Sequence, residues 1–251
     1  MFTRRRFPAL CAAAALSMLA ACGNGADDSA TTAAPGATTS SIVAEIPLET
    51  RALPPADYAA YRSQMTACGA EAPPEARELT FPSPDDMAID ADERPTATIT
   101  TSCGAIVVEL DPSLAPETVN SFVFLAGRGY FDGTVSHRIL PGFVIQAGDP
   151  TATGGGGPGY VIADEPPPAG FVYVRGTLAM ANAGPGTTGS QFFIVLGDTV
   201  QLPPDYSVFG RVVDGHETLD AIAAVPVGPA ITGEPSAPLE TVYIESIAVE
   251  R

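Results

Sequence analysis

The chain has 251 residues, of which 45% are hydrophobic, so it is long and apolar enough to bury a substantial core. Its 25 glycines and 25 prolines favour many turns and few long helices. The formal net charge is −17, and all 12 basic residues are arginines. Because a phosphate backbone must be met by clustered basic side chains, this composition excludes nucleic acid as the partner.

The first 21 residues have the layout of an export signal. Arg4 to Arg6 form a positive segment, and the apolar run at 7–21 is too short to span a bilayer as a mature helix. The run ends Leu19-Ala20-Ala21-Cys22, which resembles the lipobox of bacterial lipoproteins. This resemblance implies that Cys22 is lipidated and that the mature chain is anchored to the cell membrane on its extracytoplasmic face.

Two alternatives stay open for this segment. An Ala-rich end also occurs at ordinary secretory cleavage sites, which would leave the chain without a lipid. The three consecutive arginines fit the general secretory route as well as twin-arginine export. The sequence therefore predicts export, with a lipid anchor as the expected form.

The next two segments connect this signal to the main domain. Residues 22–45 are mostly small and polar, which predicts a flexible tether. Residues 46–95 are Pro-rich and acidic, and we expect an extension that packs partly on the main domain, with a short helix near 57–67. Once the signal is removed and Cys22 is lipidated, Cys68 and Cys103 remain. In an oxidising compartment we expect a disulfide between them, the alternative being two independent buried thiols.

The main domain is expected at residues 96–251. The β-branched segment 97–110 is interrupted by Ser-Cys-Gly, which predicts a hairpin. Pro116 and Glu117 begin an amphipathic segment that predicts a helix, and a second helix is expected at 217–223. Further strands are expected at 135–139, 143–148, 160–162, 177–182, 191–196, 207–212 and 241–249. About eight strands and two short helices predict a mainly β fold, a closed eight-stranded antiparallel β-barrel capped by the helices.

Motifs for several other kinds of site are weak. The Gly-x-Gly-x-x-Gly spacing at 154–159 is followed by no predicted helix, so a dinucleotide-binding loop is not indicated. His137 and His216 are the only histidines, which argues against an imidazole-based zinc site. The sequence has no Gly-x-Ser-x-Gly, the elbow of many hydrolases. We therefore expect neither a metal nor a cofactor.

Two blocks of sequence carry the chemical information. Residues 130–149 read YFDGTVSHRILPGFVIQAGD, and residues 176–194 read GTLAMANAGPGTTGSQFFI. In order and spacing they resemble the cyclophilin family of peptidyl-prolyl cis-trans isomerases. The resemblance covers about residues 96–250, includes the run VFGRV at 208–212, and does not extend to the first 95 residues.

Carried over position by position, the resemblance implies that Arg138 is the catalytic residue. It implies that Phe143, Phe193 and Leu202 form the walls of a proline pocket, and that Gln146 and Asn182 hydrogen-bond the substrate backbone. The full set of implied substrate-binding residues is His137, Phe143, Val144, Gln146, Ala181, Asn182, Gln191, Phe193, Leu202 and Tyr206.

Two positions depart from the family pattern. Ser136 stands where an aromatic residue usually precedes the His-Arg pair, which predicts looser packing behind Arg138. Gln201 stands where some members carry a Trp that donates to cyclosporin, and this chain has no Trp. We therefore expect weak cyclosporin binding with catalysis preserved.

The resemblance implies an enzyme that rotates X–Pro peptide bonds. We expect a monomer that acts on proline-containing segments and assists the folding of exported proteins at the cell envelope. The alternative is a binding module of the same fold, a chaperone or adhesion protein that holds such segments with little turnover. The joint presence of the arginine, the pocket walls and the amide groups favours the enzyme, whereas Ser136 and Gln201 keep the alternative open.

Overall fold

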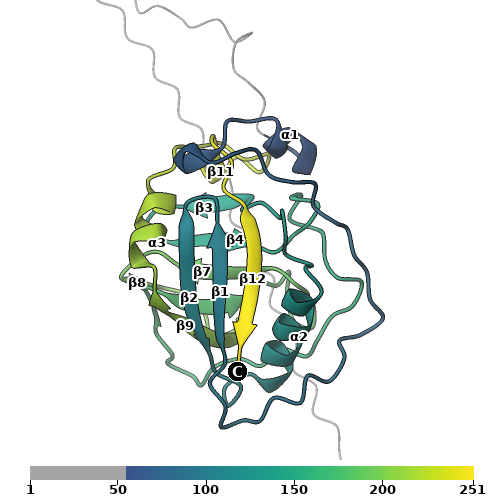
Figure 1. Ribbon diagram of the computed structural model, residues 1–251. Coiled ribbons are helices and arrows are strands. Elements are labelled where there is room, and N and C mark those ends of the chain that lie inside the picture. Colours follow the sequence, from purple (N-terminus) through teal and green to yellow (C-terminus); the bar gives the residue numbers. More distant parts are fainter. Residues whose placement is uncertain (1–54) are drawn as a thin grey trace, which may run out of the picture. The chain divides into compact units, whose positions relative to one another are not determined.

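The structure is a computed structural model that describes residues 55–251 (Figure 1). The expected export signal, Cys22 and the expected tether at 22–45 lie outside the described residues. No helix within residues 55–251 is both long and apolar enough to cross a bilayer.

Eight strands form one antiparallel sheet in the order β12–β1–β2–β9–β6–β7–β4–β3. They are β1 (Thr96–Thr101), β2 (Gly104–Leu110), β3 (Arg138–Leu140), β4 (Val144–Ala147), β6 (Thr177–Met180), β7 (Phe192–Val195), β9 (Val208–Asp214) and β12 (Ile244–Glu250). Two small ladders lie apart from it, namely β5 (Tyr173–Val174) with β8 (Thr199–Val200), and β10 (Val227–Gly228) with β11 (Ala237–Pro238). In Figure 1, β1, β2 and β12 cross in front of β3, β4 and β7, so the sheet curls around its interior.

The expected closed barrel is wrong, because the edge strands β3 and β12 are not paired with each other. A single bridge, Val135 to Tyr243, joins the segments that lead into these two strands. The free edge of β3 instead meets the segment before β11, where Ile139 N donates to Ser236 O at 2.9 Å. Pro235 and Pro238 flank that contact and have no N–H to donate, so a continuous ladder cannot form there. The sheet is a curled half-barrel.

Two helices pack against the sheet, α2 (Pro116–Gly127) and α3 (His216–Ala223), on opposite sides in Figure 1. Pro116 opens α2 at a position where its missing N–H costs nothing. The Glu165 carboxylate accepts hydrogen bonds from Glu117 N at 3.0 Å and from Thr118 N at 2.8 Å. These bonds satisfy free donors at the helix start and place a negative charge at the positive end of the helix dipole.

The elements expected in the main domain are largely present, with two differences. The hairpin β1–β2 and both helices lie where they were predicted. The strand expected at 135–139 begins only at Arg138, because the residues before it bond to the segment that enters β12. The strand expected at 160–162 is reduced to one bridge between Ile162 and Thr188.

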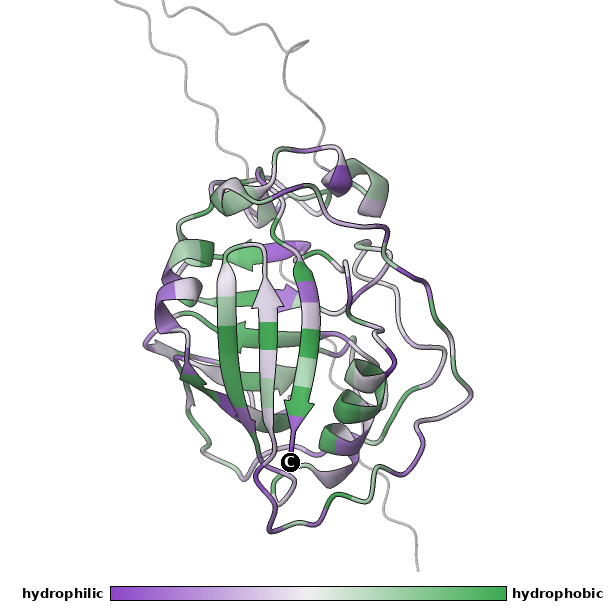
Figure 2. Cartoon of the chain, viewed as in Figure 1, coloured by the Kyte–Doolittle hydropathy of each residue, from purple (hydrophilic) through white to green (hydrophobic). Residues whose placement is uncertain are grey.

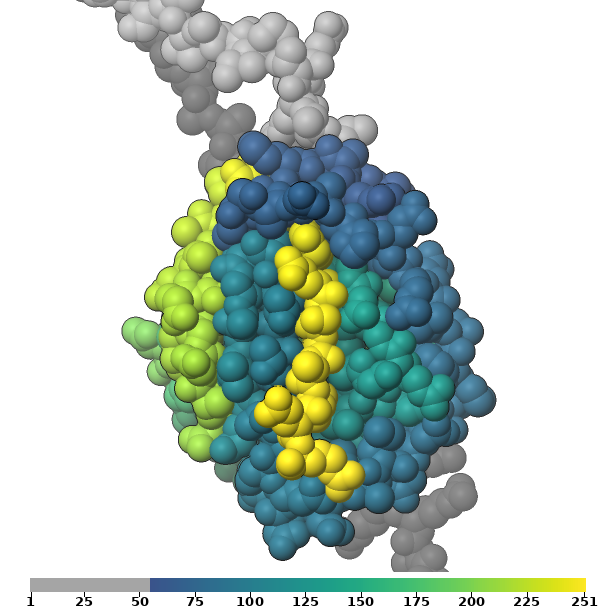
Figure 3. All heavy atoms as spheres, in the orientation of Figure 1, coloured from purple at the N-terminus to yellow at the C-terminus, as the bar shows by residue number. Residues whose placement is uncertain are grey.

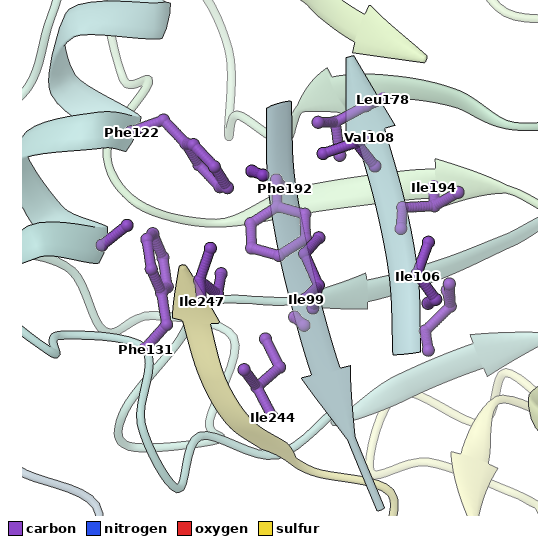
Figure 4. Close-up of a cluster of buried hydrophobic side chains, with 14 of the residues drawn as sticks. Ile99, Ile106, Val108, Phe122, Phe131, Leu178, Phe192, Ile194, Ile244 and Ile247 are labelled. Atoms are coloured by element: carbon purple, nitrogen blue, oxygen red, sulfur yellow. The ribbon is translucent and has the colours of Figure 1, made fainter. Parts of the chain in front are cut away.

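The main core lies between the curled layers of the sheet and α2 (Figure 4). Phe122 of α2 is at its centre, with ring centroids 5.3 Å from Phe131, 5.6 Å from Phe192 and 5.2 Å from Phe209. Aromatic pairs at these spacings add to the hydrophobic stabilisation that burial provides. Figure 2 shows hydrophobic residues concentrated in the strands of the sheet and in α2.

A second apolar cluster lies on the other face of the sheet. Strand β7 contributes to both clusters, because Phe192 and Ile194 enter the main core while Phe193 and Val195 enter the second. All four residues of β7 are therefore buried. The second cluster is completed by Val144, Tyr173, Ala179, Val200 and Val208, with Phe143, Phe171, Ala181, Leu202 and Tyr206 packed against it.

Polar contacts fix the chain just before β7. The hydroxyl of Ser190 donates to Gly148 O at 2.7 Å and lies 3.0 Å from the Tyr130 hydroxyl. Gly148 has a φ of +89°, and a Cβ there would lie 2.5 Å from Ser190 O. Only glycine allows the two segments to approach this closely.

The Pro-rich extension packs along the main domain. It contains α1 (Tyr58–Arg62), which falls within the expected short helix, and the 3₁₀ turn η2 (Ala67–Gly69). Cys68 forms a disulfide with Cys103 in the β1–β2 turn. Further along, Phe81 lies 5.1 Å from the Phe124 ring of α2. In Figure 3 the extension covers one end and one flank of the molecule, beside β12.

Candidate active site

The site begins at the β3–β4 hairpin. Arg138 stands directly opposite Gln146 in the antiparallel register, so their side chains share one face of the sheet. The hairpin turns through Gly142, whose φ of +74° favours glycine, and Phe143 N donates to Leu140 O at 2.9 Å. This short connection fixes the two functional side chains with respect to each other.

The same face continues across β7 and β6. Gln146 is opposite Phe193, and Phe193 is opposite Ala179. The intervening residues Ile139 and Ile145 point the other way, into the main core. Strand alternation therefore places a charged, an amide and an aromatic side chain in one row.

This row forms one wall of a cavity of about 260 Å³. The cavity is lined by Arg138, Phe143, Val144, Gln146, Ala181, Asn182, Phe193, Leu202 and Tyr206. All nine belong to the set implied by the sequence resemblance. Two members of that set, His137 and Gln191, do not line it.

One side of the cavity is apolar. Phe193 lines it and is 5% exposed, and the centroid of the Tyr206 ring lies 5.5 Å from that of the Phe193 ring, at an interplanar angle of 85°. Phe143 and Leu202 are partly buried beside them. Four such side chains around a small cavity suit a compact apolar ring such as that of proline.

The other side of the cavity holds the charge. Arg138 Nε donates to Glu234 Oε2 at 2.7 Å, and Nη2 donates to Glu234 Oε1 at 2.9 Å. The remaining terminal nitrogen, Nη1, lies 3.4 Å from Gln146 Oε1. A two-point contact with a carboxylate holds the guanidinium plane, so Nη1 is the end left for a ligand in the cavity.

Glu234 is a site residue that the sequence analysis missed. It lies 96 positions from Arg138 in a loop rich in proline, and no local pattern marks it. The hydrogen bond from Arg138 lowers the pKa of this carboxyl group below its usual value of 4.5. Glu234 is therefore ionised at neutral pH and partly balances the charge of the arginine.

A chain of amides extends from the cavity. Gln146 Nε2 donates to Gln191 Oε1 at 2.9 Å, and Gln191 Nε2 donates to the carbonyls of Gly154 and Gly156, each at 3.0 Å. Gln191 thus lines an adjoining cavity of about 310 Å³, which shares Gln146, Ala181 and Asn182 with the first. Gln191 therefore contacts the Gln146 amide but does not line the 260 Å³ cavity.

His137 is partly buried and does not line the cavity. Among buried side-chain nitrogens and oxygens in residues 55–251, its Nδ1 is the one without a hydrogen-bond partner. Burial lowers the pKa of His137, the nearby Asp149 opposes that shift, and Arg138 adds to it. The ring is consequently neutral at pH 7.

Comparisons with known proteins agree with this geometry. Residues 96–249 match the family model described as cyclophilin type peptidyl-prolyl cis-trans isomerase/CLD. Peptidyl-prolyl cis-trans isomerase B of Streptomyces anulatus is 45% identical over 172 residues, which cover 61% of this chain and 95% of that protein. A probable peptidyl-prolyl cis-trans isomerase B of Mycobacterium leprae is 44% identical over 170 residues, covering 62% of this chain and 57% of that protein.

Solved structures give the same result. A cyclophilin type peptidyl-prolyl cis-trans isomerase of Cryptosporidium parvum matches with a TM-score of 0.57 and 34% identity, over 63% of this chain and 99% of the other. The same protein in the presence of the dipeptide Ala-Pro matches with a TM-score of 0.57 and 36% identity. The chain therefore belongs to the cyclophilin family and is a peptidyl-prolyl cis-trans isomerase.

Proposed function

We propose that Arg138 is the catalytic residue of this isomerase and that it acts on X–Pro bonds held in the 260 Å³ cavity. The observation that carries this proposal is the convergence of Arg138 Nη1, the Gln146 amide and the Phe193 ring on that one cavity. The substrate is a proline-containing peptide segment, with the proline ring against Phe193 and its aromatic and aliphatic neighbours.

The chemistry follows from the electronic structure of the peptide bond. An X–Pro bond rotates slowly because the nitrogen lone pair is delocalised into the carbonyl, which gives a barrier of roughly 18–20 kcal/mol. In the twisted transition state that lone pair is localised on nitrogen. A donor at Arg138 Nη1 stabilises the twisted state more than either planar isomer, which is the condition for a rate gain.

The expected gain can be compared with a single oxyanion donor in other enzymes. Such a donor contributes about 3–4 kcal/mol in a site that excludes water. By transition-state arithmetic this equals roughly a hundred- to a thousandfold in rate. Gln146 and Asn182 hold one flank of the peptide while the other flank turns.

The test is catalysed cis–trans exchange of a short Ala-Pro-containing peptide, measured by NMR on the full chain and on Arg138→Ala. We expect exchange to fall about a hundredfold in the variant, the factor of one lost donor. Arg211→Ala is the matched control, because that arginine pairs with Glu109 on the sheet and lines no part of the cavity. Peptide binding without catalysed exchange in the unmodified chain would favour the binding module instead.

We further propose that the enzyme works as a lipid-anchored monomer on the extracytoplasmic face of the cell membrane, where it assists the folding of exported proteins. The signal-like segment ending at Cys22 supports export and lipidation. The Cys68–Cys103 disulfide supports an oxidising compartment, since such bonds are rare in the cytosol.

Expression in a bacterial host tests this location. We expect the mature chain in the membrane fraction, with a mass that shows a diacylglycerol group on Cys22, and a soluble or unprocessed chain for Cys22→Ala. Cys11→Ala is the matched control, since Cys11 lies inside the expected signal and should not affect lipid attachment. A mature chain without lipid would leave ordinary secretion as the route.

A further inference from the structure

The N-terminal extension reaches the strand that carries Arg138. Tyr61 of α1 is 3% exposed, and its hydroxyl donates to the carbonyl of His137 at 2.8 Å. His137 is the residue immediately before Arg138, at the start of β3. Burial raises the pKa of Tyr61 to about 12, so the hydroxyl keeps its proton over the physiological pH range.

The ring of Tyr61 supports the same segment from the side. It packs in a cluster with Val135, Ala152 and Tyr243, each of them at most 5% exposed. Tyr61 therefore contacts the chain on both sides of Ser136, the position where the resemblance led us to expect an aromatic residue and looser packing. An aromatic side chain from outside the family-matched region 96–249 now lies against that segment.

Several links hold α1 and the following turn in place. Tyr58 N donates to Thr151 O at 2.9 Å, in the loop after β4. Ala67 N donates to Thr241 O at 3.0 Å, and Thr241 N donates to Met65 O at 2.8 Å, before β12. The Cys68–Cys103 disulfide then joins the extension to the β1–β2 turn. Figure 3 shows the extension lying across this end of the molecule.

The strand that needs this support is short. β3 has three residues and lies at the open edge of the sheet, so the ladder with β4 holds it on one side. On its other side one backbone bond, from Ile139 N to Ser236 O at 2.9 Å, joins it to the segment before β11. The segment before it is held by Ser136 N to Val242 O at 2.8 Å and by Tyr61 to His137 O. Catalytic groups must be held to within about half an ångström of their productive positions, and a short edge strand with so few bonds on its outer side needs further support to provide this.

We propose that Tyr61 is a positioning residue for Arg138, so that the N-terminal extension is part of the active-site machinery of this isomerase. Its hydroxyl fixes the carbonyl at the start of β3, and its ring fixes the preceding segment. The inference rests on the proposed catalytic role of Arg138.

The experiment compares Tyr61→Phe with Tyr58→Phe in the full chain. Tyr61→Phe keeps the ring in its cluster and removes only the bond to His137. Tyr58→Phe is the matched control on the same helix, because its hydroxyl bonds only within the extension, to Pro74 O and Ala76 N. NMR exchange at saturating peptide gives kcat, and a titration gives the peptide Kd.

We expect Tyr61→Phe to lower kcat about three- to tenfold, the factor of one buried hydrogen bond, with the peptide Kd changed less than about twofold. Tyr58→Phe should keep both values. Unchanged kcat in Tyr61→Phe overturns the inference, as does an equal loss of kcat in both variants. Arg138→Ala is measured alongside; full activity in that variant would refute the proposed role of Arg138 itself, a different failure.

Discussion

Replacing Glu234 with glutamine tests what its ion pair contributes to catalysis. Glu234→Gln keeps the length of the side chain and one acceptor oxygen, but it removes the charge and one of the two bonds to Arg138. Without that two-point contact the guanidinium can leave the plane in which Nη1 points to the cavity. The expected result is a lower kcat, with a fall in the free energy of unfolding of at most about 1 kcal/mol.

The magnitude follows from the exposure of the pair. The side chains of Arg138 and Glu234 are 30% and 36% exposed, so solvent screens their attraction. Ion pairs exposed to this extent contribute up to about 1 kcal/mol net, which we take as the upper limit of what this pair contributes to holding the guanidinium in place. At about 1.4 kcal/mol per factor of ten, the loss corresponds to roughly a fivefold lower kcat.

The assay is NMR exchange of an Ala-Pro peptide at saturation, measured between about pH 4 and pH 8. The pKa of Glu234 is lower in the folded chain than its usual value of 4.5. The contribution of the ionised Glu234 carboxylate is therefore fully present above pH 4.5, and it is lost as the pH falls through the lower folded-state pKa. The wild-type advantage should therefore be constant above about pH 5 and shrink below it. Glu109→Gln, which loosens an exposed pair with Arg211, is the matched control. Equal or faster exchange in Glu234→Gln at neutral pH would show that the ion pair restrains Arg138 without helping it.

Three further predictions concern the disulfide, His137 and the proline cavity. Removing the disulfide with Cys68→Ser and Cys103→Ser should lower the free energy of unfolding by about 4 kcal/mol, because the bond closes a loop of 35 residues. Urea unfolding measures this difference, and an unchanged unfolding midpoint would contradict the prediction. The pKa of His137 is lowered in the folded chain, so as the pH drops below 6.5 the unfolded chain binds a proton there first. The free energy of unfolding should therefore fall, by up to about 1.4 kcal/mol per pH unit. His137→Asn should flatten that part of a series of urea-unfolding measurements at different pH, and an identical slope would exclude His137 as the cause. Leu202→Ala should weaken peptide binding about five- to tenfold through lost apolar contact, and it should affect folding little because Leu202 is only partly buried. Calorimetric titration measures the peptide Kd, and an unchanged Kd would place the proline ring elsewhere.

Most of the cavity residues could be predicted from the sequence through the family resemblance, and the structure shows that the central part of the cavity is local in the chain. Arg138 and Gln146 are eight positions apart on two strands joined by a tight turn, and the register of that hairpin brings them to one face. Phe193 joins them through the adjacent ladder. The family resemblance supplied the site assignment of all nine lining residues, several of which lie in loops that no periodicity describes.

The features that could not be predicted depend on distant pairing. Glu234 meets Arg138 across 96 positions, and Tyr61 meets His137 across 76. Neither residue type is marked by a motif, and Tyr61 lies outside the region that the resemblance covers. The closed barrel failed for a related reason, because whether two edge strands pair depends on the length of β3 and on the prolines beside it.

The burial of both faces of β7 has a consequence for how accurately the sheet assembles. Phe192 and Phe193 are consecutive, so a slip of the strand by one position would still bury a phenylalanine on each face. Burial of apolar side chains therefore distinguishes poorly between the correct strand register and a register shifted by one residue. The bonds of the Ser190 hydroxyl to Gly148 O and the Tyr130 hydroxyl are lost in such a slip, and they make the correct alignment the favoured one. A buried hydroxyl outside the cavity thus helps to set which phenylalanine lines it.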